Sequence, residues 1–256
     1  MIVLAELFPS GVNDLFDWPS FGPGGFNKTA MMCFISTIVC SVIFIAGSRK
    51  RALVPSGIQN VAESGFELVE QSIAVEVMGE ESGKKWAPFL ATLFFWIFFI
   101  NIWSVIPGIQ FPATSRLAIP LFLALQTWVI FIVVGFKHQG PLYILKEIFP
   151  PGVPKPLYLL VAPIELVSKF IIRPFSLMVR LFANMVAGHV LLTVFAVMCE
   201  ELLHANSGAY QIALIPLPFF MLTAMTGFEI LVALLQAYIF TILTAVYVGE
   251  AIHPQH

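Results

Sequence analysis

Charged residues are scarce in this chain. Of its 256 residues, 59% are hydrophobic and 11% are charged, whereas a soluble domain carries about 25% charged residues. The formal net charge is −2, which gives no electrostatic reason to bind nucleic acid. These features argue against a soluble domain and a nucleic-acid-binding protein, and they indicate an integral membrane protein.

Cysteine pairs and nucleotide-binding motifs are also lacking. Cys33, Cys40 and Cys199 are odd in number and lie in apolar runs, so we interpret them as packing residues and expect no disulfide, metal or cofactor. The phosphate-binding motif GxxxxGK[ST] is absent, so nucleotide chemistry is not expected on this chain. The stretch MIVLAELFPS has no basic residue, which argues against a cleaved signal peptide.

Long hydrophobic runs occupy most of the chain. A helix needs about 20 apolar residues to cross a bilayer core of about 30 Å, and five runs meet this length. The predicted spans are 29–48, 86–106, 117–136, 157–203 and 209–250. We expect an extramembrane segment, 1–27, ahead of a single membrane domain, 28–256. Residues 56–83 mix acidic and apolar residues, which predicts either an amphipathic helix on the membrane surface or an ordinary solvated helix.

The last two apolar runs are unusually long. At 1.5 Å per residue, a helix of about forty residues is about 60 Å long, about twice the hydrocarbon thickness. Each run must therefore form a hairpin or cross the membrane at a steep tilt. Neither midpoint, near Arg180 and Glu229, has a turn rich in proline or asparagine. We therefore predict an all-α membrane fold that ends in two long, tilted helices packed antiparallel.

Basic residues are divided unequally between the predicted loops. If the spans alternate, eight lie on one side: Arg49, Lys50, Arg51, Lys84, Lys85, Lys137, Lys146 and Lys155. Lys28 and Arg116 lie on the other. By the positive-inside rule, the N-terminus is expected outside and the C-terminus in the cytoplasm. This pattern, without a transit peptide, favours a bacterial plasma membrane.

Arg180 lies within an apolar run, and no acidic residue occurs between Glu165 and Glu200. A guanidinium group cannot lose its proton, and a charge inside a membrane needs a partner or water. We therefore infer that a carboxylate on another subunit is the partner of Arg180. At about 100° per residue, the same helical face carries Lys169, Arg173, Ser176 and Asn184. Lys169 and Arg173 could instead extend to lipid head groups.

Glu229 and His189 are a second pair of polar residues inside the predicted membrane region. A carboxyl and an imidazole on facing helices can exchange protons near neutral pH, although a structural ion pair is the simpler alternative. Gln236 shares a helical face with Glu229. Asn184 and Gln236 could also serve as interhelical hydrogen-bonding residues, and Glu165 and Lys169 could be an ordinary i,i+4 pair.

Three stretches together resemble subunit a of the F-type ATP synthases. They are RPFSLMVRLFANMVAGH from Arg173, LVALLQAYIFTILTAVYVGEAI from Leu231 and FWIFFINIWSVIPG from Phe95. The resemblance covers about residues 28–252 and implies a membrane stator that is no enzyme on its own. It would face the ring of c-subunits with its last two helices, and subunit b of the peripheral stalk would be a further partner.

The resemblance also implies roles for individual residues. Arg180 would meet each ring carboxylate and seal two offset half-channels from each other, with Asn184 and Gln236 beside it. His189 and Glu229 match the outer half-channel, in the order found in mitochondria and many bacteria.

Glu165 and Ser176 are the candidates for the inner half-channel, although Glu165 lies one residue further from Arg180 than in the mitochondrial pattern. Glu201 and His204 would lie near the outer entrance. A self-contained secondary transporter is the alternative, but it predicts internal repeats, and the hydropathy has none. The choice between proton and sodium would be set largely by the ring.

Overall fold

A computed structural model of the chain describes residues 28–49, 57–106, 113–149, 155–204 and 215–252, without the side chains of Lys28, Lys146, Lys155, Leu203 and His204. Every regular element within these ranges is a helix, as the all-α prediction requires. Five of these helices are long and apolar enough to cross a membrane, which confirms the predicted number of candidate spans. The predicted extramembrane segment 1–27 lies outside the described residues.

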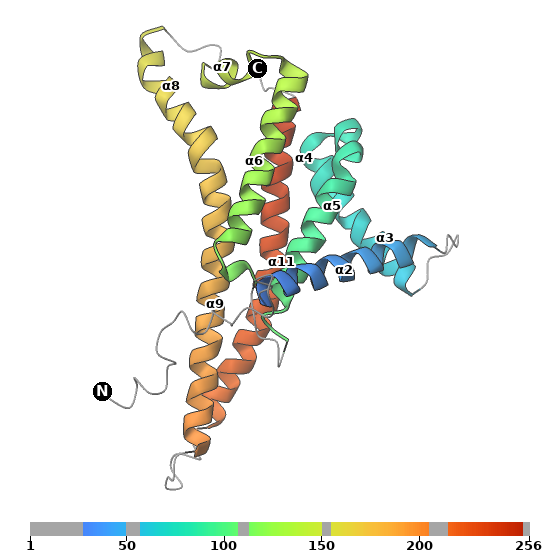
Figure 1. Cartoon of the computed structure of the whole chain (residues 1–256), viewed down its shortest axis with the longest axis vertical. Coiled ribbons are helices and arrows are strands. Elements are labelled where there is room, and N and C mark those ends of the chain that lie inside the picture. The colour runs from blue at the N-terminus through green and yellow to red at the C-terminus, as the bar shows by residue number, and fades with distance from the viewer. Residues whose placement is uncertain (1–27, 50–56, 107–112, 150–154, 205–214, 253–256) are drawn as a thin grey trace, which may run out of the picture.

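The helices follow the predicted runs closely, with one early start (Figure 1). They are α2 (Lys28–Arg49), α3 (Ile58–Val69), π-helical η1 (Glu70–Val75), α4 (Glu76–Met78), α5 (Glu80–Ile102), 3₁₀-helical η2 (Ala113–Ser115), α6 (Ala118–Gln139), α7 (Tyr143–Ile148), 3₁₀-helical η3 (Lys155–Leu157), α8 (Tyr158–Val167), π-helical η4 (Ser168–Ile172), α9 (Arg173–His204) and α11 (Pro216–Ile252). Helix α5 begins at Glu80 rather than Trp86. Acidic residues favour a helix N-terminus, and Glu80 also pairs with Lys84 at 2.6 Å.

The segment predicted as one helix over 56–83 ends earlier and is partly buried. Its helices stop at Met78, and Gly79, with φ of 78°, turns the chain into α5. Side chains such as Val69 and Ile73 are fully buried where α3 and η1 pack against α5. The two helical arms of this hairpin, η1 and α5, approach closely at Gly83. A methyl group added there would lie 2.6 Å from the Ala74 carbonyl oxygen. The position of the segment 56–83 on a membrane surface stays a prediction.

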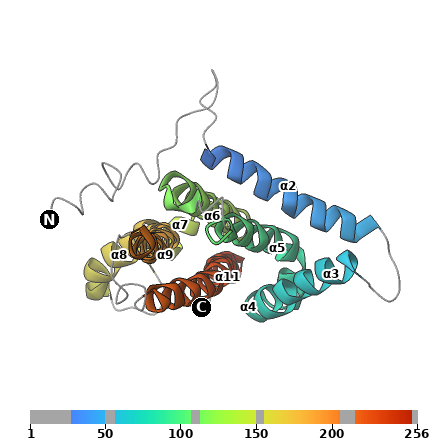
Figure 2. The same cartoon turned by 90° about the horizontal axis from the view of Figure 1, so that it is seen from below.

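The core lies where α11 packs against α5, α9 and α6, which lie around it in the bundle (Figure 2). It contains fully buried aliphatic side chains from several helices, such as Leu90 of α5, Leu181 of α9 and Val248 of α11. Helix α2 lies on the outer side of α5, and indole hydrogen bonds fasten it there. Trp103 donates to the Ser36 hydroxyl at 2.7 Å, and Trp96 donates to the Thr37 hydroxyl at 3.0 Å.

The two long helices predicted at the end of the chain are present. Helices α8, η4 and α9 follow one another without a gap, and α11 runs beside α9 in the opposite direction (Figure 1). The hairpin alternative is therefore wrong, while the tilt in a membrane stays a prediction. The predicted start of the last helix, 209, lies outside the described residues. The stretch Tyr158–Leu202 is the least covered span, since 17% of its apolar window is buried, against 44% for α5.

Candidate functional site

Arg180 lies on α9 and is partly buried. Within the described residues, its guanidinium makes no hydrogen bond or ion pair, and Tyr247 of α11 lies within range of its charge. Because a guanidinium presents five donors in a fixed fork, this side chain can bind a carboxylate in two-point contact. The prediction that such a carboxylate comes from another subunit stays a prediction.

A groove of about 380 Å³ runs between α9 and α11. Its polar residues are Asn184, Glu229 and Gln236, so the structure brings together three residues that the sequence singled out. Asn184 is exposed, whereas Glu229 and Gln236 are 3% and 5% exposed. The groove is otherwise lined by Ala187, Gly188, Leu191, Met225, Phe228, Val232, Leu235 and Ile239. It therefore offers a carboxyl and two amides within apolar walls.

The Glu229 carboxyl has little free space on the side that faces Gly188. A methyl group added at Gly188 would lie 3.2 Å from Glu229 Oε1, so the absence of a side chain at Gly188 leaves room for the carboxyl. Neither oxygen of Glu229 has a hydrogen-bond partner among the described residues. The nearby Ser104 hydroxyl donates instead to the Asn101 carbonyl oxygen at 2.8 Å. A buried carboxyl without a partner is costly and calls for a functional explanation.

His189 is buried and directly follows Gly188 on α9. Since Gly188 faces the Glu229 carboxyl, the imidazole and the carboxyl belong to the same level of the helix pair. The His189 carbonyl oxygen also accepts a hydrogen bond from the Thr193 hydroxyl at 2.8 Å. His189 and Glu229 thus lie on adjacent helices, but His189 is not among the residues that line the groove, and their pairing stays a prediction.

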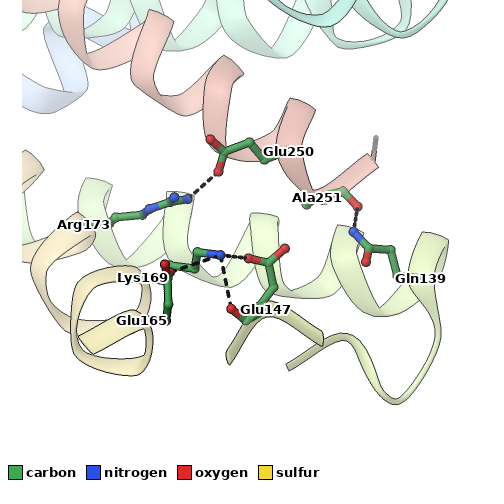
Figure 3. A network of polar contacts seen from close by, with 7 residues as sticks. All are labelled: Gln139, Glu147, Glu165, Lys169, Arg173, Glu250 and Ala251. Atoms are coloured by element: carbon green, nitrogen blue, oxygen red, sulfur yellow. Dashed lines mark hydrogen bonds and ion pairs between the residues drawn. The ribbon is translucent and has the colours of Figure 1, made fainter. Parts of the chain in front are cut away.

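Lys169 lies on η4, directly before the N-terminal end of α9, and binds two carboxylates (Figure 3). Its ammonium lies 2.6 Å from Glu147 Oε2 and 3.4 Å from Glu165 Oε2, and it also donates to the Glu147 carbonyl oxygen at 3.2 Å. The predicted i,i+4 pair of Glu165 and Lys169 is therefore confirmed. Glu147 comes from α7, and the sequence reasoning missed it because nothing local links α7 to η4.

Arg173 is also engaged within the chain. Its Nη1 donates to Glu250 Oε2 at 2.7 Å, and its guanidinium carbon lies 4.8 Å from the centre of the Tyr247 ring, which is cation–π geometry. Both Lys169 and Arg173 are therefore paired with carboxylates inside the chain, while their contact with lipid head groups stays a prediction. Glu250 was also missed, although its position three residues after Tyr247 puts both on one helical face.

A π-helical turn, η4, separates Glu165 from Arg180. Such a turn bonds i to i+5 and so accommodates one residue more than an α-helical turn. The turn therefore changes the register between Glu165 and Arg180 by about one residue relative to a continuous α-helix, while the role of Glu165 stays a prediction. Ser176 is partly buried on α9 and does not belong to the ion pairs around Lys169 in the described structure.

Two further predictions concern the residues at the C-terminal end of α9 and the binding of metal ions. Glu201 is exposed near the end of α9, and the side chain of His204 lies outside the described residues. Within the described residues, no group of three or more His, Cys, Asp or Glu side chains could hold a metal ion.

Comparison with known proteins gives one consistent result. The family model described as "ATP synthase A chain" matches residues 29–249. The "ATP synthase subunit a" of Frankia alni is 42% identical over 233 residues, which are 90% of this chain and 79% of the relative. That of Acidiphilium cryptum is 40% identical over 251 residues, which are 95% of this chain and 98% of the relative. That of Parafrankia sp. is 43% identical over 230 residues, which are 89% of this chain and 76% of the relative.

Proposed function

The chain belongs to the ATP synthase A chain family, and from this we propose that it is the proton-translocating stator subunit of an F-type ATP synthase. Its family and its apolar helices make it a membrane component in ATP synthesis and proton transport. In the proposal, nucleotide chemistry occurs on other subunits. The partners are the ring of c-subunits, which α9 and α11 face, subunit b of the peripheral stalk and the rest of the complex.

The buried Glu229 carboxyl carries the proposal. A proton path needs a group that can take up and release a proton inside the membrane. Glu229 has no hydrogen-bond partner among the described residues and lies in a groove that could admit water and a partner side chain. We assign Glu229 and His189 to the outer half-channel, which protons enter near Glu201 and His204. Glu229 then passes the proton to a ring carboxylate, while Asn184 and Gln236 line the contact.

Arg180 separates the two half-channels in this mechanism. A ring site that carries a proton is neutral and can rotate through lipid. When it reaches Arg180, the fixed positive charge stabilises the ionised carboxylate, so the proton leaves on the inner side. The same charge repels a proton that would pass directly between the half-channels. Each proton that moves down the membrane potential releases about 2.3 kcal/mol per 100 mV, and this energy drives rotation.

The inner half-channel begins near Glu165 in the proposal, with Ser176 between Glu165 and Arg180 on the same helix. Glu165 has 31% of its side chain exposed, so it can exchange protons with water. The unequal distribution of basic residues supports a bacterial plasma membrane, with the N-terminus outside and the C-terminus in the cytoplasm. The cytoplasmic side is then the end that holds Lys169 and Glu250.

ATP-driven acidification of inverted vesicles tests the function. We expect Arg180→Ala to abolish acidification and to increase the passive proton leak through the assembled complex. Arg49→Ala, at the exposed end of α2, is the matched control and should retain normal pumping. Normal pumping by Arg180→Ala would overturn the proposal and favour a self-contained transporter. Loss of pumping without added leak would retain the contact with the ring but remove the role of Arg180 as a seal.

A further inference from the structure

Three titratable residues meet where α7 packs against the helix that carries Arg180, and we call them the inner triad: Glu147, Lys169 and Glu165 (Figure 3). The Lys169 ammonium lies between the carboxylates of the other two. Their side chains are 12% (Glu147), 20% (Lys169) and 31% (Glu165) exposed. The triad is thus shielded but still reached by water. Glu147 is the most buried of its members.

The inner triad is unbalanced in charge. One ammonium faces two carboxylates, so the triad carries one net negative charge and has room for one proton. The neighbouring cation, Arg173, is already bound by Glu250 at 2.7 Å. The buried phenol of Tyr143 lies within range of Glu147, Arg173 and Glu250, and burial raises its pKa, which keeps it neutral. Among these described groups, no further cation is left to balance the second carboxylate.

We propose that Glu147 is a second proton-carrying carboxylate of the inner half-channel, which it shares with Glu165 across Lys169. This inference rests on the proposed function and adds to it a residue from a different part of the chain. During synthesis, the triad accepts one proton from the inner path as a carboxyl O–H. It then passes that proton to a cytoplasmic water molecule and returns to its net negative charge. During ATP-driven pumping, the same steps run in reverse.

A purely structural role for Glu147 can be separated from this one. Lys169 also holds α7 through the Glu147 carbonyl oxygen, and the amide oxygen of a glutamine can accept a hydrogen bond from the ammonium. Glu147→Gln therefore keeps the attachment of α7 and removes a group that takes up protons. Lys169→Gln makes the opposite change, since it leaves two carboxylates without their cation.

Inverted vesicles expose the cytoplasmic side to the medium, so the pH of the medium tests the triad directly. ATP-driven pumping is measured across pH and divided by the ATP hydrolysis rate of the same vesicles. We expect Glu147→Gln to move the pH of half-maximal pumping lower, because Glu165 and Lys169 then balance each other. Lys169→Gln should move it higher. Glu80→Gln, in an exposed ion pair, is the control and should leave the pH of half-maximal pumping unchanged.

Unchanged pH profiles in both Glu147→Gln and Lys169→Gln would overturn the inference, as would an equal loss of pumping at every pH. If Glu147→Gln does not assemble, Glu165→Gln decides: Glu147 then remains as the proton-carrying carboxylate beside Lys169, so pumping should persist, and its complete loss would overturn the inference. Arg180→Ala in the same vesicles separates the two proposals. If it still pumps, the proposed function fails; if it does not pump and the triad variants behave as wild type, this inference alone fails.

Discussion

Gly188 of α9 faces the carboxyl group of Glu229 on α11, at a distance where an added methyl group would lie 3.2 Å from Oε1. This contact joins the two long helices at the groove, which both residues line. It predicts that the size of residue 188 controls proton flow, since the carboxyl must shift by a few tenths of an ångström to admit a methyl group.

We expect Gly188→Ala to lower ATP-driven pumping by about two- to tenfold and Gly188→Val to lower it about 100-fold. The control is Gly227→Ala on α11, where an added Cβ meets no atom within 4 Å. Alanine is a better helix former than glycine, so this control should pump normally. Wild-type pumping by Gly188→Val would remove Glu229 from the proton path.

Exchange of the residues at positions 189 and 229 tests the acid and the imidazole as a pair. We expect His189→Glu and Glu229→His to reduce pumping strongly as single changes, because each leaves two groups of one kind at the same level. The double variant restores one acid and one imidazole, and it should regain a substantial part of the activity. A double variant no better than the single ones would show that position matters more than composition.

The buried hydrogen bond from the Thr114 hydroxyl to the Asn101 side-chain oxygen, at 2.5 Å, ties η2 to α5. Both residues are fully buried. Thr114→Val keeps the shape but removes the donor, and we expect it to cost about 1–3 kcal/mol of stability. The measurement is thermal release of the chain from the purified complex. Thr114→Ser keeps a hydroxyl and serves as control; equal release temperatures for all three proteins would contradict the prediction.

The Arg173–Glu250 ion pair should contribute modestly to stability. Glu250 has 39% of its side chain exposed, so solvent screens the attraction. A double-mutant cycle with Arg173→Met and Glu250→Gln should give a coupling of about 0.5–1 kcal/mol. Tyr247→Phe keeps the ring under the guanidinium and should leave the coupling intact. Zero coupling would mean that the contact is incidental to stability.

The π-helical turn η4 predicts an asymmetry between deletion and insertion. Deletion of Ile171 should convert the turn to α-helix and keep Glu165 in register with Arg180, so pumping should persist. Insertion of an alanine after Ile171 should rotate Glu165 by about 100° relative to Arg180 and reduce pumping strongly. Both variants are compared in the same vesicles. Equal loss in the two would contradict the proposed register.

The helical spans could be predicted because membrane insertion selects for long apolar runs, and those are visible in any window of sequence. The early start of α5 could not, since its first turn is stabilised by ion pairs such as Glu80 with Lys84 rather than by hydropathy. The burial of Val69 and Ile73 likewise depends on a turn at Gly79 that brings η1 back onto α5.

Candidate site residues were predictable where one helix determines their relation. Asn184 follows Arg180 by one turn, and Gln236 follows Glu229 by two. The partners of Lys169 and Arg173 were not fully predictable, because Glu147 and Glu250 reach them from α7 and α11. Such contacts depend on how distant helices are packed, and a pattern within one helix does not contain that information.

The sparse covering of the span Tyr158–Leu202, where 17% of the apolar window is buried against 44% in α5, has a consequence for the life of the chain before assembly. Under the proposed function, we expect a newly inserted copy to present this helix, which carries Arg180, to lipid until its partners bind. Until a partner covers that flank, the copy is exposed to membrane proteases. We therefore expect the abundance of this chain in a cell to follow the supply of its partners, with unassembled copies degraded rather than accumulating.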